Sequence, residues 1–197
     1  MSQVLVVGED ALCCAVGEKL VDAALPGWSL ARESVNTRGI TKLVPRLPDF
    51  IQQARHVQPV ICIADTDRSC PVNLIANWMA QGGDERFVLR LAVKEAESWL
   101  LSDPESFSSF LNVPVVKLPK RPDEEPDPKQ VVLNLASNSK SRQIRTEVVS
   151  TRDKSRPGPG YNLHLCHFVK AKWRVSEART RSPSLNRAVN RVAMLEA

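Results

Sequence analysis

Short apolar runs alternate with longer amphipathic stretches over the first half of the chain. The runs that we expect to be strands are residues 3–7, 28–35, 60–64 and 87–93. Apolar runs of this length, bounded by turn residues, are typical of strands buried in a sheet. The stretches with apolar residues at helical spacing are 11–25, 40–56 and 72–81. Because strands and helices alternate, the pattern predicts a parallel sheet with crossover helices.

The second half of the chain has a different pattern. Residues 118–129 contain four prolines and no periodicity, which predicts an exposed linker or flap. Residues 131–149 have helical spacing with a break near 137–139, and 151–160 form a loop. Residues 161–169 fit either a strand or the start of a buried helix. Ser182 and Pro183 occupy the N-cap and first position of a last predicted helix.

Acidic residues follow three of the four predicted strands. Asp65 and Asp67 come at the end of the run 60–64, and side chains two apart in an extended chain point the same way. Glu9 follows the first strand. Because the carboxyl ends of parallel strands share one sheet edge, these acids should meet there. A hard cation such as Mg²⁺ would relieve their repulsion. Turn capping by Asp and a helix N-terminal charge at Glu9 are the structural alternatives.

The third acidic position, after the strand 87–93, is ambiguous between Glu95 and Glu97. If the chain is still extended there, the two side chains point alike. If a helix has begun at Glu95, this residue shares a face with Ser98 and Glu97 turns away. We favour Glu95 and keep Glu97 as a second candidate.

Charge divides the chain into two parts. Residues 1–116 contain 10 Lys and Arg against 14 Asp and Glu, a net charge of −4, whereas residues 117–197 contain 17 against 8, a net charge of +9. We therefore expect a catalytic core over residues 1–116 and a basic, mainly helical C-terminal extension over 117–197, packed on the core. Such a division suits a carboxylate site served by a surface that binds polyanions.

The remaining composition is that of an ordinary globular protein. No apolar run approaches the roughly 20 residues of a membrane span, and no secretory signal is visible. Five cysteines without CxxC pairs favour a reduced, cytoplasmic protein.

The order of the short motifs resembles the Toprim (topoisomerase–primase) family, and in particular its small stand-alone bacterial members related to overcoming-lysogenization-defect nucleases. The residues that carry the resemblance are Val7-Gly8-Glu9, Ile63-Ala64-Asp65-Thr66-Asp67, Lys94-Glu95-Ala96-Glu97-Ser98-Trp99, Asp127-Pro128-Lys129 and Ser182-Pro183-Ser184-Leu185. The chain departs from the family pattern after Glu9, where relatives often have a second Glu and this chain has Asp10-Ala11.

The resemblance implies a Toprim-like (Rossmann-like) α/β fold and phosphoryl transfer dependent on Mg²⁺ or Mn²⁺, most simply nuclease activity. It implies Glu9 as acid/base or metal-linked carboxylate, Asp65 and Asp67 as metal ligands, and Glu95 or Glu97 as a further acid. It also suggests a defence or mobile-element system and an ATPase partner protein.

Nucleic acid would then bind the basic C-terminal part through its backbone phosphates. The side chains that we expect to bind it are Lys140, Arg142, Arg145, Arg152, Lys154, Arg156, Lys170, Lys172, Arg174, Arg179 and Arg181. With aromatic residues at 5% of the chain, base stacking is a weak expectation.

Three other interpretations stay open. Asp65-Thr66-Asp67 also resembles the nucleophile motif of haloacid-dehalogenase phosphatases, although two crossovers precede it and the usual downstream partners are missing. A Toprim-like scaffold without activity, which binds nucleic acid or a partner protein, is the second. His164 and Cys166 would share a face of a strand, but no second pair of zinc ligands is evident, so a buried strand with satisfied histidines is favoured.

Overall fold

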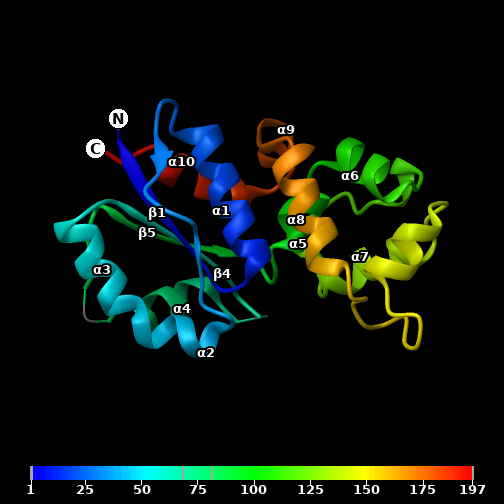
Figure 1. Ribbon diagram of the computed structural model, residues 1–197, viewed down its shortest axis with the longest axis horizontal. Coiled ribbons are helices and arrows are strands. Elements are labelled where there is room, and N and C mark those ends of the chain that lie inside the picture. Colours follow the sequence, from blue (N-terminus) through cyan, green and yellow to red (C-terminus); the bar gives the residue numbers. More distant parts are fainter. Residues whose placement is uncertain (1, 68, 81, 197) are drawn as a thin grey trace.

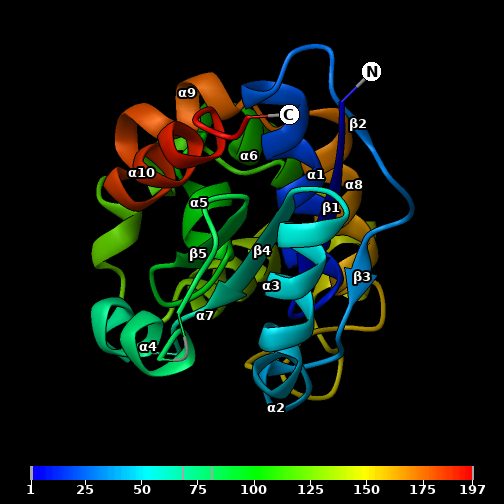
Figure 2. The ribbon, with the colours of Figure 1, turned by 90° about the vertical axis from the view of Figure 1, so that its left-hand side faces the viewer.

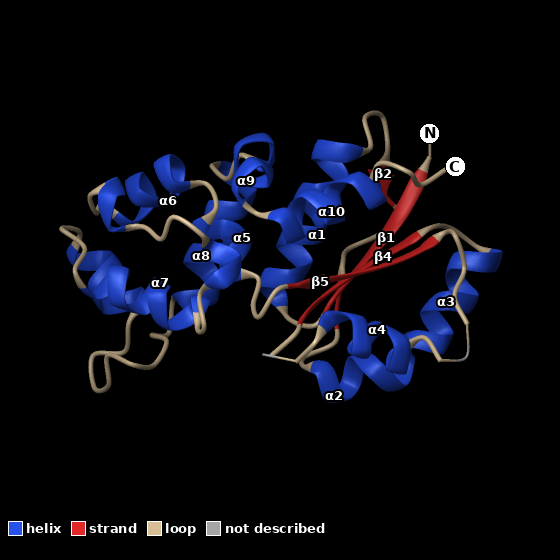
Figure 3. Ribbon diagram, turned by 180° about the vertical axis from the view of Figure 1, so that it is seen from behind, coloured by secondary structure: helices blue, strands red, loops and turns tan. Residues whose placement is uncertain are grey.

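The computed structural model describes residues 2–67, 69–80 and 82–196. Its strands are β1 (Gln3–Gly8), β2 (Ser29–Leu30), β3 (Val35–Asn36), β4 (Val60–Asp65) and β5 (Phe87–Ala92). They form one five-stranded sheet in the order β2-β1-β4-β5, with β3 also paired to β1, and every pair is parallel. The predicted Rossmann-like α/β fold is confirmed (Figures 1 and 3).

Helices make up most of the remaining described chain. They are α1 (Ala11–Ala24), α2 (Ile40–Leu43), α3 (Leu47–His56), α4 (Pro71–Trp78), α5 (Glu97–Leu101), α6 (Pro104–Leu111), α7 (Pro128–Ser137), α8 (Tyr161–Ala171), α9 (Val175–Arg181) and α10 (Pro183–Val192). Short 3₁₀ turns occupy Val44–Arg46, Val115–Lys117 and Pro122–Glu124, and Ile144–Val148 form a π-helical turn. Figure 1 shows α5 to α9 beyond the carboxyl end of the sheet.

The two faces of the sheet bury two separate apolar clusters. Along β4, Val60, Cys62 and Ala64 face the cluster formed with α2, α3 and α4, whereas Ile61 and Ile63 face the other cluster. This alternation is the period of two expected of a strand buried on both faces. Figure 2 shows α3 and α4 on one side of the strands and α1 and α10 on the other.

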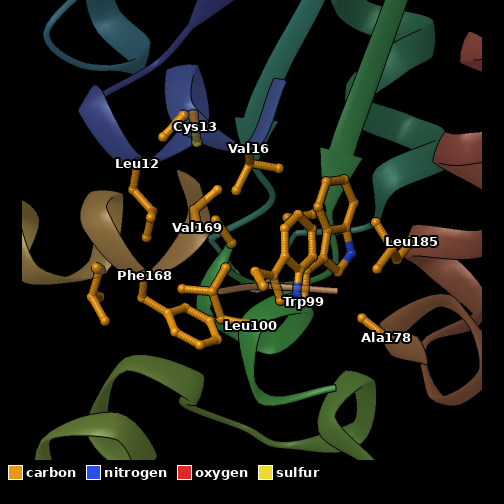
Figure 4. Packing of buried hydrophobic residues seen from close by; sticks show 14 of the residues in the cluster. Leu12, Cys13, Val16, Trp99, Leu100, Phe168, Val169, Ala178 and Leu185 are labelled. Carbon is orange, nitrogen blue, oxygen red and sulfur yellow. The ribbon is translucent and has the colours of Figure 1, made fainter. Parts of the chain in front are cut away.

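The larger cluster extends from the sheet into the C-terminal helices. Trp99 and Leu100 of α5 are fully buried and pack with α1, α8 and α10 (Figure 4). The same cluster contains Phe168 and Leu185, so it includes residues on both sides of the charge boundary at residue 117. The division into residues 1–116 and 117–197 stays a prediction.

Several local predictions need correction. The expected strand 28–35 is two short strands separated by a bend. Of the two alternatives for residues 161–169, the buried helix start is correct and the strand is wrong, since the segment belongs to α8, and α9 was not expected. The segment 118–129 is not a free flap, because the carboxylate of Asp123 accepts hydrogen bonds from Ser182 Oγ at 2.7 Å and Ser184 N at 2.9 Å.

The helical assignment of α8 removes the basis for a shared zinc face. Residues two apart on a helix point roughly 200° apart, so His164 and Cys166 diverge. His164 Nε2 instead lies 2.5 Å from Glu147 Oε2.

An ion pair between the exposed Arg174 and the buried Asp103 joins α6 to the segment that begins α9. Asp103, the N-cap of α6, is fully buried and accepts from Arg174 Nη2 at 2.6 Å and from Arg174 N at 3.0 Å. Burial raises the pKa of Asp103, but the hydrogen bonds from Arg174 and Ser106 outweigh it and leave the pKa below its usual value. Arg174, predicted to bind nucleic acid, therefore has a structural partner.

Replacing Arg174 with Ala should destabilise the fold more than Arg152→Ala does, because it leaves the buried carboxylate of Asp103 short of donors. Since the pKa of Asp103 is lowered in the folded state, its contribution is complete above the unfolded pKa, about 3.9. That contribution is lost as the pH falls through the lower, folded pKa. Denaturant unfolding at pH 7 and at successively lower pH measures both effects. The exposed Arg152→Ala is the charge-matched control, and equal stability of the two variants would contradict the prediction.

Candidate metal-binding active site

Glu9 and Asp65 lie side by side at the carboxyl edge of the sheet. The strands β1 and β4 are neighbours with Gly8 opposite Ile63, so the residues that follow them leave the sheet together. Asp65 N donates to Glu9 Oε2 at 3.1 Å, and Glu9 N donates to Ile63 O at 3.1 Å. The structure thus brings together the acids that follow the first and third predicted strands.

Gly8 makes this close approach possible. A Cβ at Gly8 would lie 2.5 Å from Cys14 N and 2.6 Å from Cys14 Sγ, closer than any real contact. The strand can therefore meet the first turn of α1 only without a side chain at this position. Asp10 caps that turn, since its Oδ1 accepts from Cys13 N at 2.8 Å.

Asp65 also holds the start of α5. Its Oδ1 accepts from Ala96 N at 2.8 Å, and Cys13 Sγ lies 3.8 Å from the same oxygen. One carboxylate therefore contacts segments that follow β1 and β5 as well as its own strand. This explains why the charges of Glu97 and Glu9 raise the pKa of Asp65, although the three residues are far apart in sequence.

The turn that carries Asp67 has an unusual backbone. Asp67 and Lys94 both have positive φ, 46° and 66°, a conformation that costs a non-glycine residue about 1 kcal/mol or more. Asp67 N donates to Lys94 O at 3.1 Å, and Lys94 N donates to the buried Thr66 Oγ1 at 2.7 Å. The two strand ends are thus locked to each other, and the exposed Asp67 is placed at the rim of the site.

Glu95 and Glu97 both belong to the acidic region, in different ways. Glu95 Oε2 accepts from Lys129 N at 2.8 Å, at the start of α7. Glu97 is buried, and its Oε1 accepts from Tyr161 Oη at 2.8 Å. Glu95 lines the open cavity beside Asp67, whereas Glu97 lies in the interior.

A cavity of about 210 Å³ opens at this edge. Asp67, Lys94, Glu95, Pro126 and Asp127 line it. The ammonium group of Lys94 donates to Glu124 O at 2.9 Å and to Glu125 O, so the strand end holds the segment that forms the far wall. Sequence reasoning missed Lys94 and Asp127 as wall residues. Their only signal was that both lie within motifs that resemble the Toprim pattern.

The site concentrates negative charge in poorly solvated surroundings. Burial raises the pKa of Asp65 well above its usual value, and the charges of Glu97 and Glu9 add to the shift. Burial likewise raises the pKa values of Glu9 and Glu95. It raises the pKa of Glu97 to about 7, although the ammonium of Lys129 acts in the opposite direction. The attraction of a bound cation would offset both the cost of burying these carboxylates and the repulsion between them.

The donor chemistry of this site fits a hard divalent ion, with one restriction. Within the described ranges, no group of three or more His, Cys, Asp or Glu side chains is gathered tightly enough to hold a metal. Mg²⁺ commonly binds through one or two carboxylates and completes its octahedron with water and substrate phosphates, and the acids here suit that mode. The three-ligand set Glu9, Asp65 and Asp67 stays a prediction.

The predicted nucleic-acid-binding residues fall into two groups. Lys170 and Arg174 have acidic partners inside the fold, with Lys170 Nζ 2.9 Å from Glu18 Oε2. Arg156 pairs with its near neighbour Asp153 at 3.3 Å, and Arg145 donates to Ser139 O. Arg179 Nε donates to Asn186 Oδ1 at 2.9 Å. The other predicted residues are exposed on the surface: Lys140, Arg142, Arg152, Lys154, Lys172 and Arg181.

Comparison with known proteins adds no relative. No family model matches the chain, and neither curated proteins nor solved structures give a match. Any function must therefore be argued from the site itself.

Among the helices of the described ranges, none has the length and apolar character needed to cross a bilayer.

Proposed function

We propose that this chain is a Toprim-type nuclease that depends on Mg²⁺ or Mn²⁺ and cleaves phosphodiester bonds of nucleic acid. The observation that carries the proposal is the contact between Glu9 and Asp65 across two neighbouring strand ends. Asp67 and Glu95 lie at the rim of the same edge, beside an open cavity. Carboxylates at the carboxyl edge of a parallel sheet are well placed to act on a ligand there.

The residues of the site would divide the work as follows. Asp65 and Asp67 would hold the metal ion, which supplies Lewis-acid stabilisation of a phosphoryl oxygen. Glu9, with its raised pKa, would accept or hold a proton next to Asp65. Lys94 keeps the wall segment in place through its bonds to Glu124 and Glu125, and Lys129 partly neutralises Glu97 and Glu95. A cytoplasmic location, a defence or mobile-element context and an ATPase partner belong to the same proposal.

A cleavage assay tests this function. Wild type, Glu9→Gln and Asp65→Asn are incubated with DNA and RNA in Mg²⁺, in Mn²⁺ and in EDTA. We expect cleavage only by wild type and only with metal, with a loss of at least about 100-fold in both variants. Asp22→Asn is the matched control, because Asp22 is an exposed acid near the far end of α1, about 18 Å along the helix from Asp10.

Equal cleavage by all four proteins would show that the acidic edge is not the active site. A covalent aspartyl-phosphate trapped on Asp65 with a phosphomonoester substrate would instead favour the haloacid-dehalogenase interpretation. Metal-independent binding of nucleic acid without any cleavage would favour the scaffold without activity.

A further inference from the structure

A second charged feature lies on β5, which ends the strand order of the sheet. A cavity of about 180 Å³ lies between β5, α4 and the start of α10. It is lined by Arg90 and Arg187 together with Pro71, Val72, Ile75 and Ser184. Figure 2 faces this side of the molecule, with α10 above β5 and α4 below it. None of its arginines belongs to the basic C-terminal set considered above.

Arg90 is an unusual residue for a buried strand. On β5, Val88 and Ala92 face the cluster shared with α10, and the alternation of side chains puts Arg90 on that same face. Its Nε atom is buried and has no hydrogen-bond partner among the described residues. This N–H donor costs free energy, because no acceptor replaces the water that it loses on burial.

Two further arginines come from α10. Arg187 and Arg191 are four residues apart and therefore share one side of the helix, beside the apolar stripe that packs on the sheet. Arg191 Nη2 donates to the backbone oxygen of Glu85 at 2.9 Å, and Arg187 is exposed. Burial and the positive charges of Arg191 and Arg187 lower the pKa of Arg90. The three guanidinium groups thus repel one another.

The arginine groove, as we name the cavity with Arg90, Arg187 and Arg191, lies next to the acidic edge. Its wall includes Val93, the residue before Lys94, and Pro71, four residues after Asp67. Ala92 is paired with Asp65 across the strands, and Arg90 precedes Ala92 by two residues, about 7 Å along the strand. A chain of phosphates held in the groove would extend towards the proposed site of cleavage.

We propose that the arginine groove binds the phosphodiester backbone of the nucleic acid that the acidic site acts upon. The inference rests on the proposed function for its purpose, but binding is measured separately from cleavage. Guanidinium groups suit phosphate because their donors match its oxygens in pairs. Arg90 as a whole is only partly buried and lines the cavity, so its guanidinium group can contribute to binding there.

Binding is tested in EDTA, where no cleavage interferes. A labelled single-stranded DNA, its duplex and the RNA of the same sequence are titrated against wild type, Arg187→Gln/Arg191→Gln and Arg90→Met at several salt concentrations. The matched control is Arg32→Gln/Arg46→Gln, which removes the same charge from exposed positions elsewhere. Circular dichroism and melting temperatures establish that each variant is folded.

We expect the groove double variant to bind at least about tenfold more weakly at low salt. The slope of log K against log salt should fall by about 1.4 to 1.8, the value for two lost phosphate contacts. Arg90→Met should weaken binding while raising the melting temperature, because it removes an unpartnered buried donor. The proposal is overturned if the groove double variant and the control bind with equal affinity and slope, or if wild type binds none of the three probes. Intact binding by a wild type that cleaves nothing contradicts only the proposed function.

Discussion

Replacement of Asp65 by Asn should make the metal-free protein more stable and abolish its metal-dependent cleavage. The carboxylate of Asp65 is largely withdrawn from water and lies beside Glu9 and Glu97, so its negative charge is opposed by burial and by repulsion. Asn has nearly the same shape, and its amide oxygen can still accept from Ala96 N. The substitution therefore removes the charge and keeps the contact that holds α5.

We expect the melting temperature in EDTA to rise by about 2–4 °C, the change that corresponds to roughly 1 kcal/mol in a protein of this size. Addition of Mg²⁺ or Mn²⁺ should raise the melting temperature of wild type, because a ligand that binds only the folded state stabilises it. The same addition should leave the melting temperature of Asp65→Asn unchanged. Such an exchange of stability for function is common at active sites.

Two controls make the result specific. Asp22→Asn removes an exposed carboxylate and should change neither the melting temperature in EDTA nor the response to metal. Ca²⁺ in place of Mg²⁺ distinguishes general charge screening from a site with a preference for small ions. A metal-free Asp65→Asn that melts below wild type, or one that keeps the full metal response, would contradict the account of this site.

The strands and their acidic ends were predictable because each step needs only local sequence. Apolar runs mark buried strands, and parallel pairing brings their carboxyl ends to one edge whatever the loops do. The proximity of Glu9 to Asp65 follows from that topology alone. The fold class was therefore predictable to the level of a parallel sheet with flanking helices.

The exact roles of Glu95 and Glu97 were not predictable, because Lys94 adopts a left-handed backbone conformation. Both sequence alternatives assumed that the chain continued either as a strand or as a helix from Glu95. The turn at Lys94 changes direction first, and α5 begins only at Glu97. Such a conformation at a lysine depends on tertiary bonds, here to Thr66, which a local pattern does not reveal.

The basic residues illustrate a different limit. Net charge predicts that a surface attracts polyanions, but it does not say which cations already have partners. Lys170 and Arg174 form ion pairs with Glu18 and Asp103. Arg90 lies within an apolar run that predicts a buried strand, so the sequence does not mark it as a binding residue. Only the packing of α10 beside β5 brings Arg90 together with Arg187.

Truncation of Trp99 to Ala should have the largest effect on stability of any change considered. Trp99 is fully buried where α5 meets α1, α8 and α10 (Figure 4). Its Nε1 donates to Ser184 Oγ at 2.7 Å. Loss of a buried tryptophan side chain costs about 3–5 kcal/mol through lost burial and the cavity left behind. We therefore expect the melting temperature to fall by about 10 °C or more, or the fold to be lost.

Trp99→Phe keeps the test informative if the alanine variant does not fold. It retains most of the apolar volume but loses the hydrogen bond to Ser184, so we expect a cost of about 1–2 kcal/mol. Trp78→Ala is the matched control, because Trp78 on α4 is only partly buried, and its truncation should cost less than that of Trp99. Since Trp99 lies in a cluster that spans residue 117, unfolding followed by circular dichroism and by tryptophan fluorescence should give one coincident transition in wild type and in Trp99→Phe. Two separate transitions in Trp99→Phe, with the sheet still folded after the first, would show that the C-terminal helices unfold on their own and that this cluster does not join them to the core.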